Sequence, residues 1–235
     1  MKTPDPASAR EARHAKADDA PSGTRSIATT AELRSAVNAC RRCPLWRAAT
    51  QGVGGEGPEP ASLMLVGEQP GDVEDVEGRP FVGPAGAILD RALEEAEIDR
   101  DAVYLTNAVK HFKFEPKGKR RLHARPNAAE IQACRWWLEQ ELRLVKPKLA
   151  VALGATAARG LLGRPVTIAT MRGTAVPLNE STHLWVTIHP SYLLRIQDEA
   201  ARRSEYVRFV QDLQGAKEWM RQWLRAHVPQ RREQA

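Results

Sequence analysis

The sequence lacks any long hydrophobic run. No window approaches eighteen consecutive apolar residues, which argues against a membrane-spanning helix. The first residues, MKTPDPASAREARHAKADDAPSG, carry charges where a secretory signal would have its apolar stretch. We therefore expect a cytoplasmic protein of the cytosol or nucleoid, without a membrane partner. Nothing in the sequence indicates an oligomer, so we expect a monomer.

Cysteine is scarce, with three residues in a chain of 235. The number is odd, and two of the three, Cys40 and Cys43, are spaced as C-x-x-C. This pattern argues against the disulfide framework of a secreted domain and favours metal or thiol chemistry in a reducing compartment.

Phosphate-binding glycine motifs are also absent. Gly83 and Gly86 in FVGPAG superficially suggest a phosphate loop, but neither the G-x-G-x-x-G nor the G-K-[ST] spacing occurs. A mononucleotide-binding domain is therefore excluded.

The composition is that of a globular chain, with 42% apolar and 27% charged residues and a net charge of +6. The charge is unevenly distributed. The segment 110–125, KHFKFEPKGKRRLHAR, holds seven basic residues and one acidic residue, which leaves 28 of each sign elsewhere. All of the net charge therefore comes from this segment, and it points to an anionic partner.

The pattern along the chain predicts one α/β domain between two tails. Residues 1–28 are polar without periodicity, so we expect a disordered N-terminal tail, then a domain at 29–227 and a C-terminal tail at 228–235. Short apolar runs predict a mostly parallel sheet of four strands, with a possible minor strand at 174–178. Expected strands are 62–67, 103–109, 149–154 and 182–190, and expected helices are 30–40, 87–98, 127–145, 156–162, 191–196 and 204–225.

Three loops that follow these strands carry reactive side chains. They are GEQPGD after the first strand, NAVKHF after the second and HPS after the fourth. Ligands of such sheets bind beyond the carboxyl ends of the strands. We therefore expect the three loops to converge on one site.

The C-x-x-C pair is the best metal-ligand candidate, because it can bind one ion or cluster from a single turn. With three cysteines in all, a four-ligand site must recruit another residue. Cys134 is available, and His111 at the end of a strand is the best-placed histidine. Either zinc or an iron-sulfur cluster fits this set. The alternatives are a dithiol redox pair or buried cysteines that act as small apolar side chains.

The basic segment can be a solvated loop, a general patch for nucleic acid or a phosphate contact beside the site, and its concentrated charge favours the last. His123 lies in its middle. A histidine among cations is expected to have a lowered pKa, which leaves a neutral ring that can act as base or nucleophile.

Other candidate residues have ordinary structural alternatives. Glu68 and Gln69 in GEQPG present a carboxylate and an amide on a glycine-flanked turn, but can equally form a helix cap. Asn107 and His189 end two strands, and each alone is as readily structural.

Taken together, GEQPG, GRPFVGPAG, TNAVKHF and HPSYLLR resemble the uracil-DNA glycosylase superfamily, in its iron-sulfur, family-4-like branch. The resemblance extends from about Cys40 to the C-terminal helix. Two departures from family 4, His111 in place of a cysteine and the insert KRRLH, resemble the UdgX subgroup, whose members become covalently attached to uracil-containing DNA.

The resemblance implies a three-layer α/β/α sandwich and a 4Fe-4S cluster held by Cys40, Cys43, His111 and Cys134, with zinc as the alternative. It implies a uracil-containing DNA partner, with single strands preferred. Asn107 would read the uracil edge, Phe81 would stack on the ring, and His189 of the HPS loop, which includes Ser191, would donate to uracil O2.

The resemblance also implies the chemistry. Glu68 would supply a carboxylate beside the sugar cation and His123 the nucleophile, while Gln69 would position His123 or the base. Arg121 would orient the loop or hold a phosphate. Phosphate contacts are expected from Lys117, Lys119, Arg120 and Arg125. Two rival hypotheses stand beside this one: a hydrolytic glycosylase with turnover, and a nucleic-acid-binding metalloprotein without chemistry.

Overall fold

The computed structural model describes residues 27–227. The tails predicted at 1–28 and 228–235 fall outside this range, except for Ile27 and Ala28, and the domain predicted at 29–227 fills nearly all of it.

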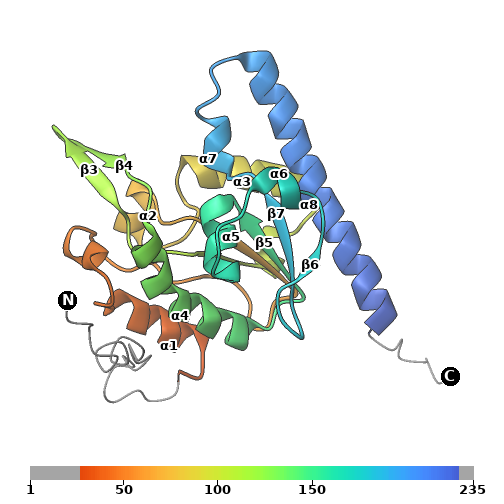
Figure 1. Cartoon of the computed structure of the whole chain (residues 1–235), viewed down its shortest axis with the longest axis horizontal. Helices are drawn as coiled ribbons and strands as arrows, with labels where there is room; N and C mark the ends of the chain where they lie inside the picture. The colour runs from red at the N-terminus through yellow and green to blue at the C-terminus, as the bar shows by residue number, and fades with distance from the viewer. Residues whose placement is uncertain (1–26, 228–235) are drawn as a thin grey trace, which may run out of the picture.

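The domain is built around one sheet, and Figure 1 shows helices on both of its sides. The strand order is β2-β1-β5-β7-β6. All neighbours are parallel except β6, which pairs antiparallel with β7. The strands are β1 (Leu63–Gly67), β2 (Val103–Asn107), β5 (Leu149–Leu153), β6 (Val176–Pro177) and β7 (His183–Thr187). The four predicted strands are confirmed, and the minor strand expected near 174–178 raises the total in this sheet to five.

Each face of the sheet has its own hydrophobic core, so the predicted three layers are present. On one face Leu63, Leu65 and Val151 pack against α3 (Pro84–Glu95) and α8 (Glu199–His227). On the other face Met64, Val66 and Ala152 pack against α4 (Ala128–Val145) and α5 (Ala155–Leu162). Because alternate residues of a strand point to opposite faces, strands covered on both sides read as continuous apolar runs.

Further helices lie beside these layers. The helix α1 (Thr30–Asn38) begins at the N-cap Thr29 and packs through Leu33 and Val37 against α4. The helix α4 begins with the predicted capping box, in which Asn127 and Glu130 each accept from the other's backbone N–H. A short helix, α7 (Pro190–Leu193), follows β7.

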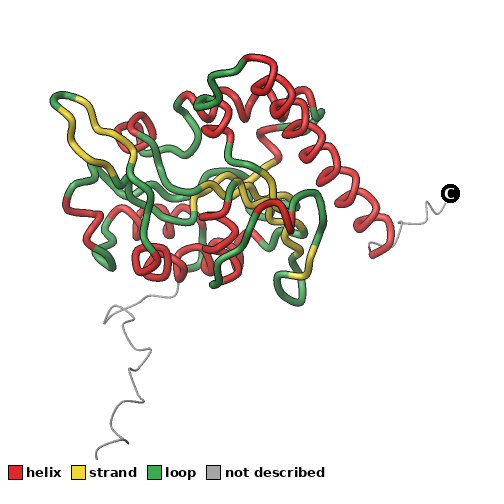
Figure 2. The backbone as a smooth tube through the Cα atoms, turned by 45° about the horizontal axis from the view of Figure 1, so that its top comes forward, coloured by secondary structure: helices red, strands yellow, loops and turns green. Residues whose placement is uncertain are grey.

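Two segments predicted to be loops contain regular structure. The loop after β1 holds α2 (Asp72–Glu77), which ends at Gly78 in a left-handed conformation. The basic segment folds into an antiparallel hairpin of β3 (Phe114–Lys117) and β4 (Arg120–His123), turning at Gly118, whose φ is +59°. Figures 1 and 2 show this hairpin projecting from the body of the domain.

Smaller corrections concern element ends and short helices. The last helix begins at Glu199, five residues before the predicted start at 204. The additional short elements are α6 (Ile168–Met171) and the 3-10 helices η2 (Pro44–Arg47) and η3 (Arg100–Ala102). Between residues 27 and 227, no helix combines the length and apolar character needed to cross a bilayer.

Candidate active site

A cavity of about 1260 Å³ opens at the carboxyl ends of the parallel strands. It brings together the loops that follow β1, β2, β5 and β7, together with the end of the hairpin. Its lining includes Glu68, Gln69, Phe81, Asn107, His123, Arg125, Thr156, His189 and Ser191. All but Thr156 are residues that the sequence singled out.

Glu68 lies between two partners at the end of β1. Its Oε1 is 3.2 Å from Nε2 of His123, and its Oε2 accepts a hydrogen bond of 2.5 Å from the hydroxyl of Thr156. Burial alone would raise the pKa of Glu68, but the hydrogen bonds from His123 and Thr156 outweigh it and the pKa is lowered. The site therefore holds an ionised carboxylate against an imidazole. Sequence reasoning missed Thr156, whose position at the start of α5 was its only signal.

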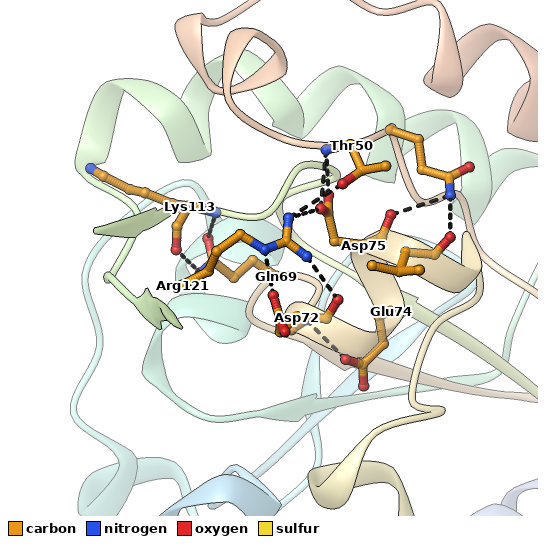
Figure 3. Close-up of polar contacts among 10 residues, drawn as sticks. Thr50, Gln69, Asp72, Glu74, Asp75, Lys113 and Arg121 are labelled. Carbon is orange, nitrogen blue, oxygen red and sulfur yellow. Dashed lines mark hydrogen bonds and ion pairs between the residues drawn. The ribbon is translucent and has the colours of Figure 1, made fainter. Parts of the chain in front are cut away.

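His123 ends β4, and its side chain is 46% exposed. The hairpin that carries it is fastened at its base by Gln69. The Gln69 amide donates to the carbonyls of Lys113 and Ala124, at 3.0 and 3.1 Å, and its Oε1 accepts from the Lys113 N–H. Figure 3 shows the bonds between Gln69 and Lys113. Gln69 and Glu68 are neighbours in the loop after β1. The bonds of Gln69 to the base of the hairpin therefore fix the position of His123 relative to Glu68.

Arg121 is a second anchor of the hairpin (Figure 3). Its guanidinium forms 2.5 Å ion pairs with Asp72 and Asp75 of α2 and lies over the rings of Phe112 and Phe114. Two carboxylates balance its charge, so the geometry favours orientation of the hairpin over a phosphate contact. Since alternate residues of a strand share a face, anchoring Arg121 toward the body also directs His123 that way.

Asn107 and Phe81 lie together over the end of β1. A Cβ added to Gly67 would be 2.2 Å from Asn107 Oδ1 and 2.7 Å from Phe81 Cζ, so only glycine allows both side chains this position. Phe81 is buried and has a positive φ of 57°. An amide and an aromatic ring therefore border the cavity side by side, and together they can contact a flat polar ring.

His189 faces the same cavity from the end of β7. Its Nδ1 accepts from the Ser191 N–H at 3.1 Å and lies 2.8 Å from the Ser191 hydroxyl. An accepting Nδ1 leaves the proton on Nε2. Burial lowers the pKa of His189 to about 4, so the ring is neutral at pH 7 and can donate one hydrogen bond from Nε2. Its ring is stacked on Phe81 at a centroid distance of 6.3 Å.

The other predicted cations occupy two places. Lys117, Lys119 and Arg120 are exposed at the turn of the hairpin, and none is in an ion pair with a residue of the described range. Arg125 lies at the mouth of the cavity with its Nε 3.9 Å from Glu68 Oε2, and its side chain is 78% exposed. Both places leave positive charge open to an anion.

The predicted metal ligands are all buried, and Cys43 and Cys134 belong to one apolar cluster, while Cys40 belongs to a neighbouring one. The thiol of Cys134 hydrogen-bonds Cys43 and lowers the pKa of Cys43 to about 7, toward the thiolate that binds metals. Cys40 accepts from the indole N–H of Trp137 at 3.1 Å. Burial lowers the pKa of His111 to about 4, and its buried Nδ1 has no hydrogen-bond partner.

These four residues fit a metal group in their chemistry, because an orphaned imidazole nitrogen and an acidic thiol are both metal-binding features. They do not converge on a single point. Across residues 27–227, no three His, Cys, Asp or Glu side chains come close enough to hold one metal ion. Ligands of a four-iron cluster bind different iron atoms, so they stand farther apart than those around one zinc ion.

The sequence of this domain matches the family model of the uracil DNA glycosylase superfamily over residues 55–214. The chain belongs to the uracil-DNA glycosylase superfamily. It is 37% identical over 186 residues to the type-4 uracil-DNA glycosylase of Thermotoga maritima, covering 79% of this chain and 91% of that one. It is 34% identical over 182 residues to the type-4 uracil-DNA glycosylase of Pyrobaculum aerophilum, covering 74% and 88%. A type-5 uracil-DNA glycosylase of the same organism is 31% identical over 176 residues, covering 68% and 74%.

The uracil-DNA glycosylase match spans the whole cavity and the hairpin, and begins after Cys40 and Cys43. Within it, sequence reasoning predicted the positioning role of Gln69 but missed the two carboxylates that anchor Arg121. Asp72 and Asp75, which anchor Arg121, are spaced three apart, so they lie on one side of a helical turn. That spacing was the available signal, but the segment was predicted to be a loop.

Proposed function

We propose that this chain excises uracil from DNA and becomes covalently attached to the product through His123, as UdgX-type glycosylases do. The observation that carries the proposal is the pairing of His123 Nε2 with Glu68 Oε1 at 3.2 Å, with the histidine exposed at the cavity mouth. The relatives named above are uracil-DNA glycosylases, which supports the substrate.

Uracil recognition is assigned to Asn107 and Phe81. A uracil flipped out of the stack exposes its Watson–Crick edge. The Asn107 carbonyl can accept from uracil N3–H while its amide donates to O4, and cytosine reverses both polarities. The Phe81 ring supplies a stacking face that is independent of DNA sequence.

Bond cleavage is assigned to His189, Glu68 and His123. As the C1′–N1 bond breaks, its electron pair leaves with the base, and the neutral His189 donates from Nε2 to uracil O2 as negative charge develops. The Glu68 carboxylate stabilises the sugar cation. A ring nitrogen of His123 then forms the bond to C1′, and Glu68 can accept the proton that the imidazole loses.

The attached state is expected to be final. An N-alkylated imidazole that has lost its proton is a poor leaving group. One chain therefore reacts with one uracil.

The deciding experiment is denaturing electrophoresis after incubation with uracil-containing single-stranded DNA, in which no base pair has to be opened. A protein–DNA adduct supports the proposal. Abasic product with repeated turnover indicates the hydrolytic alternative, and unchanged DNA indicates a binding protein without chemistry.

We propose that Cys40, Cys43, His111 and Cys134 hold a 4Fe-4S cluster. Its ligands come from the segment before η2, the loop after β2 and α4, so the cluster would fasten these three parts together. The unpartnered Nδ1 of His111 and the lowered pKa of Cys43 support this assignment.

Purified protein is expected to be brown, with about four iron and four sulfide ions per chain. The variant His111→Cys should keep its iron, because thiolate is the commoner ligand, whereas His111→Ala should lose iron and melt at lower temperature. Metal analysis and thermal unfolding measure both. Colourless protein with one zinc ion would overturn the cluster, and unchanged iron in His111→Ala would place the fourth ligand elsewhere.

Neutralising the hairpin turn is expected to flatten the salt dependence of DNA binding. In Lys119→Gln/Arg120→Gln, the negative slope of log K against log salt should become less negative by about 1.4 on single-stranded DNA, because two phosphate contacts are lost. Lys146→Gln/Arg164→Gln, with both residues exposed near the amino ends of the strands, is the matched control and should keep the native slope. Equal slopes in both double variants would mean that the hairpin turn does not lie on the DNA backbone.

A further inference from the structure

A lysine and a glutamate lie fully buried behind the cavity. Lys110 follows β2 and Glu141 comes from α4, and both side chains have 0% exposure. Lys110 Nζ is 2.6 Å from Glu141 Oε2. Neither residue lines the cavity, and the mechanism proposed above uses neither.

The hydrogen bonds of this pair are complete. Lys110 Nζ also donates to the Thr106 hydroxyl and to the main-chain carbonyl of Asn107, each at 2.7 Å. Glu141 accepts from the Thr106 hydroxyl and from the Gly55 N–H. All three ammonium protons therefore have acceptors, as a charge needs in a dry environment.

Stability alone does not explain this pair. Desolvation of two charges can outweigh their attraction, and apolar residues of similar volume often serve a core equally well. The contact with Asn107 supplies another reason, because Asn107 ends an edge strand. Leu105 exchanges two hydrogen bonds with Glu56 on the outer side of β2, so the Asn107 carbonyl, two residues on, points to the same side. No described strand continues there, and Lys110 Nζ takes the place of the missing donor.

We propose that the Lys110–Glu141 pair is a positioning device for Asn107, which sets the angle at which its amide meets the uracil edge. The proposal rests on the function proposed above. The Asn107 side chain is confined in front by Gly67 and Phe81, while its carbonyl is held from behind by Lys110. Two bonds at the end of the strand also join this segment to the Glu68 loop, from Ala108 N–H to Gly67 O and from Val109 N–H to Glu68 O. Release of the carbonyl would let the amide rotate away from the base.

The test uses the double variant Lys110→Met/Glu141→Gln in the full-length chain. It removes both charges together, so no uncompensated charge is left in the core, and it removes the donor to Asn107. We expect the double variant to melt at a higher temperature than Lys110→Met alone. Its single-turnover rate of uracil release should fall at least tenfold, and its DNA affinity should stay within threefold of wild type.

A double-mutant cycle with Asn107→Ala distinguishes an effect that acts through Asn107 from a general loss of stability, because it compares rates of uracil release in two backgrounds. If the pair acts through Asn107, Lys110→Met/Glu141→Gln should slow uracil release in the wild-type background and have no further effect in the Asn107→Ala background. Equal effects in both backgrounds would overturn the proposal. Leu149→Ala, a buried core variant at the amino end of β5, is the control for lost stability and should release uracil at the native rate. Leu149 is in register with Leu63 and Val103, at the opposite end of the sheet from the Gly67–Asn107 pair.

Hydrogen exchange separates this proposal from the proposed function. Amides of residues 105–109 should exchange faster in Lys110→Met/Glu141→Gln than in Leu149→Ala, whether or not uracil is released. Unchanged exchange in this segment overturns the positioning role. Wild-type protein that releases no uracil overturns the proposed function, while the exchange result still decides whether the pair holds Asn107.

Discussion

The variant His123→Ser is expected to form no covalent adduct with uracil-containing DNA and to release uracil with turnover. Serine removes the only proposed nucleophile and leaves space for a water molecule where the imidazole stood. Glu68, still hydrogen-bonded to Thr156, can orient that water toward C1′. Denaturing electrophoresis measures the adduct, and alkaline cleavage of abasic sites measures release over many enzyme equivalents.

Peptide mapping of the wild-type adduct completes this test. Attachment at any residue other than His123 would contradict the mechanism, and so would undiminished crosslinking by His123→Ser. His227→Ser, at the exposed end of α8, is a matched control and should crosslink as wild type does.

The variant Glu68→Gln is expected to lose both adduct formation and uracil release, by roughly 100-fold or more. The carboxylate acts on the sugar cation before the paths to histidine and to water diverge, so both products depend on it. A loss of this size corresponds to about 2.7 kcal/mol in the barrier. Glutamine keeps the shape of the side chain and can still hydrogen-bond Thr156, so the change isolates the charge.

Comparison of the two variants separates the two roles. His123→Ser should change which product forms, whereas Glu68→Gln should lower all product formation at unchanged DNA binding. Equal adduct yield and rate in Glu68→Gln and wild type would show that the carboxylate charge does not contribute. Quenched-flow measurement of free uracil, with excess protein over DNA, gives the chemical step directly.

The central fold followed from local signals in the sequence. A strand buried on both faces must be apolar throughout, so Leu63–Gly67 and Leu149–Leu153 were recognisable from their letters alone. The start of α4 was predictable because Asn127 and Glu130 have the spacing of a capping box, and their side chains form its reciprocal bonds. The carboxyl ends of parallel strands meet at one edge, which is why loops distant in sequence could be expected at one cavity.

What could not be predicted depends on contacts between distant residues. The two strands of the hairpin have no alternating apolar pattern from which they could be predicted. The hairpin is held to the body by the polar contacts of Gln69 and Arg121 and does not need an apolar face. The two functions open to Arg121 could be compared only when its carboxylate partners were known. Lys110 and Glu141 are separated by 31 positions, and both would ordinarily be expected on the surface.

For the function proposed above, the base of the hairpin shows how a turnover enzyme and a trapping enzyme can share one scaffold. Its two ends meet, since the Ala124 N–H donates to the Lys113 carbonyl at 3.0 Å and Gln69 binds both. A segment that leaves and re-enters a fold at adjacent points can be gained or lost while the rest of the chain keeps its course. Glu68, Asn107 and His189 all lie at or just after the carboxyl ends of strands, outside this segment. A short insertion in the gene could therefore convert a recycling catalyst into a single-use one and leave the machinery of base recognition in place.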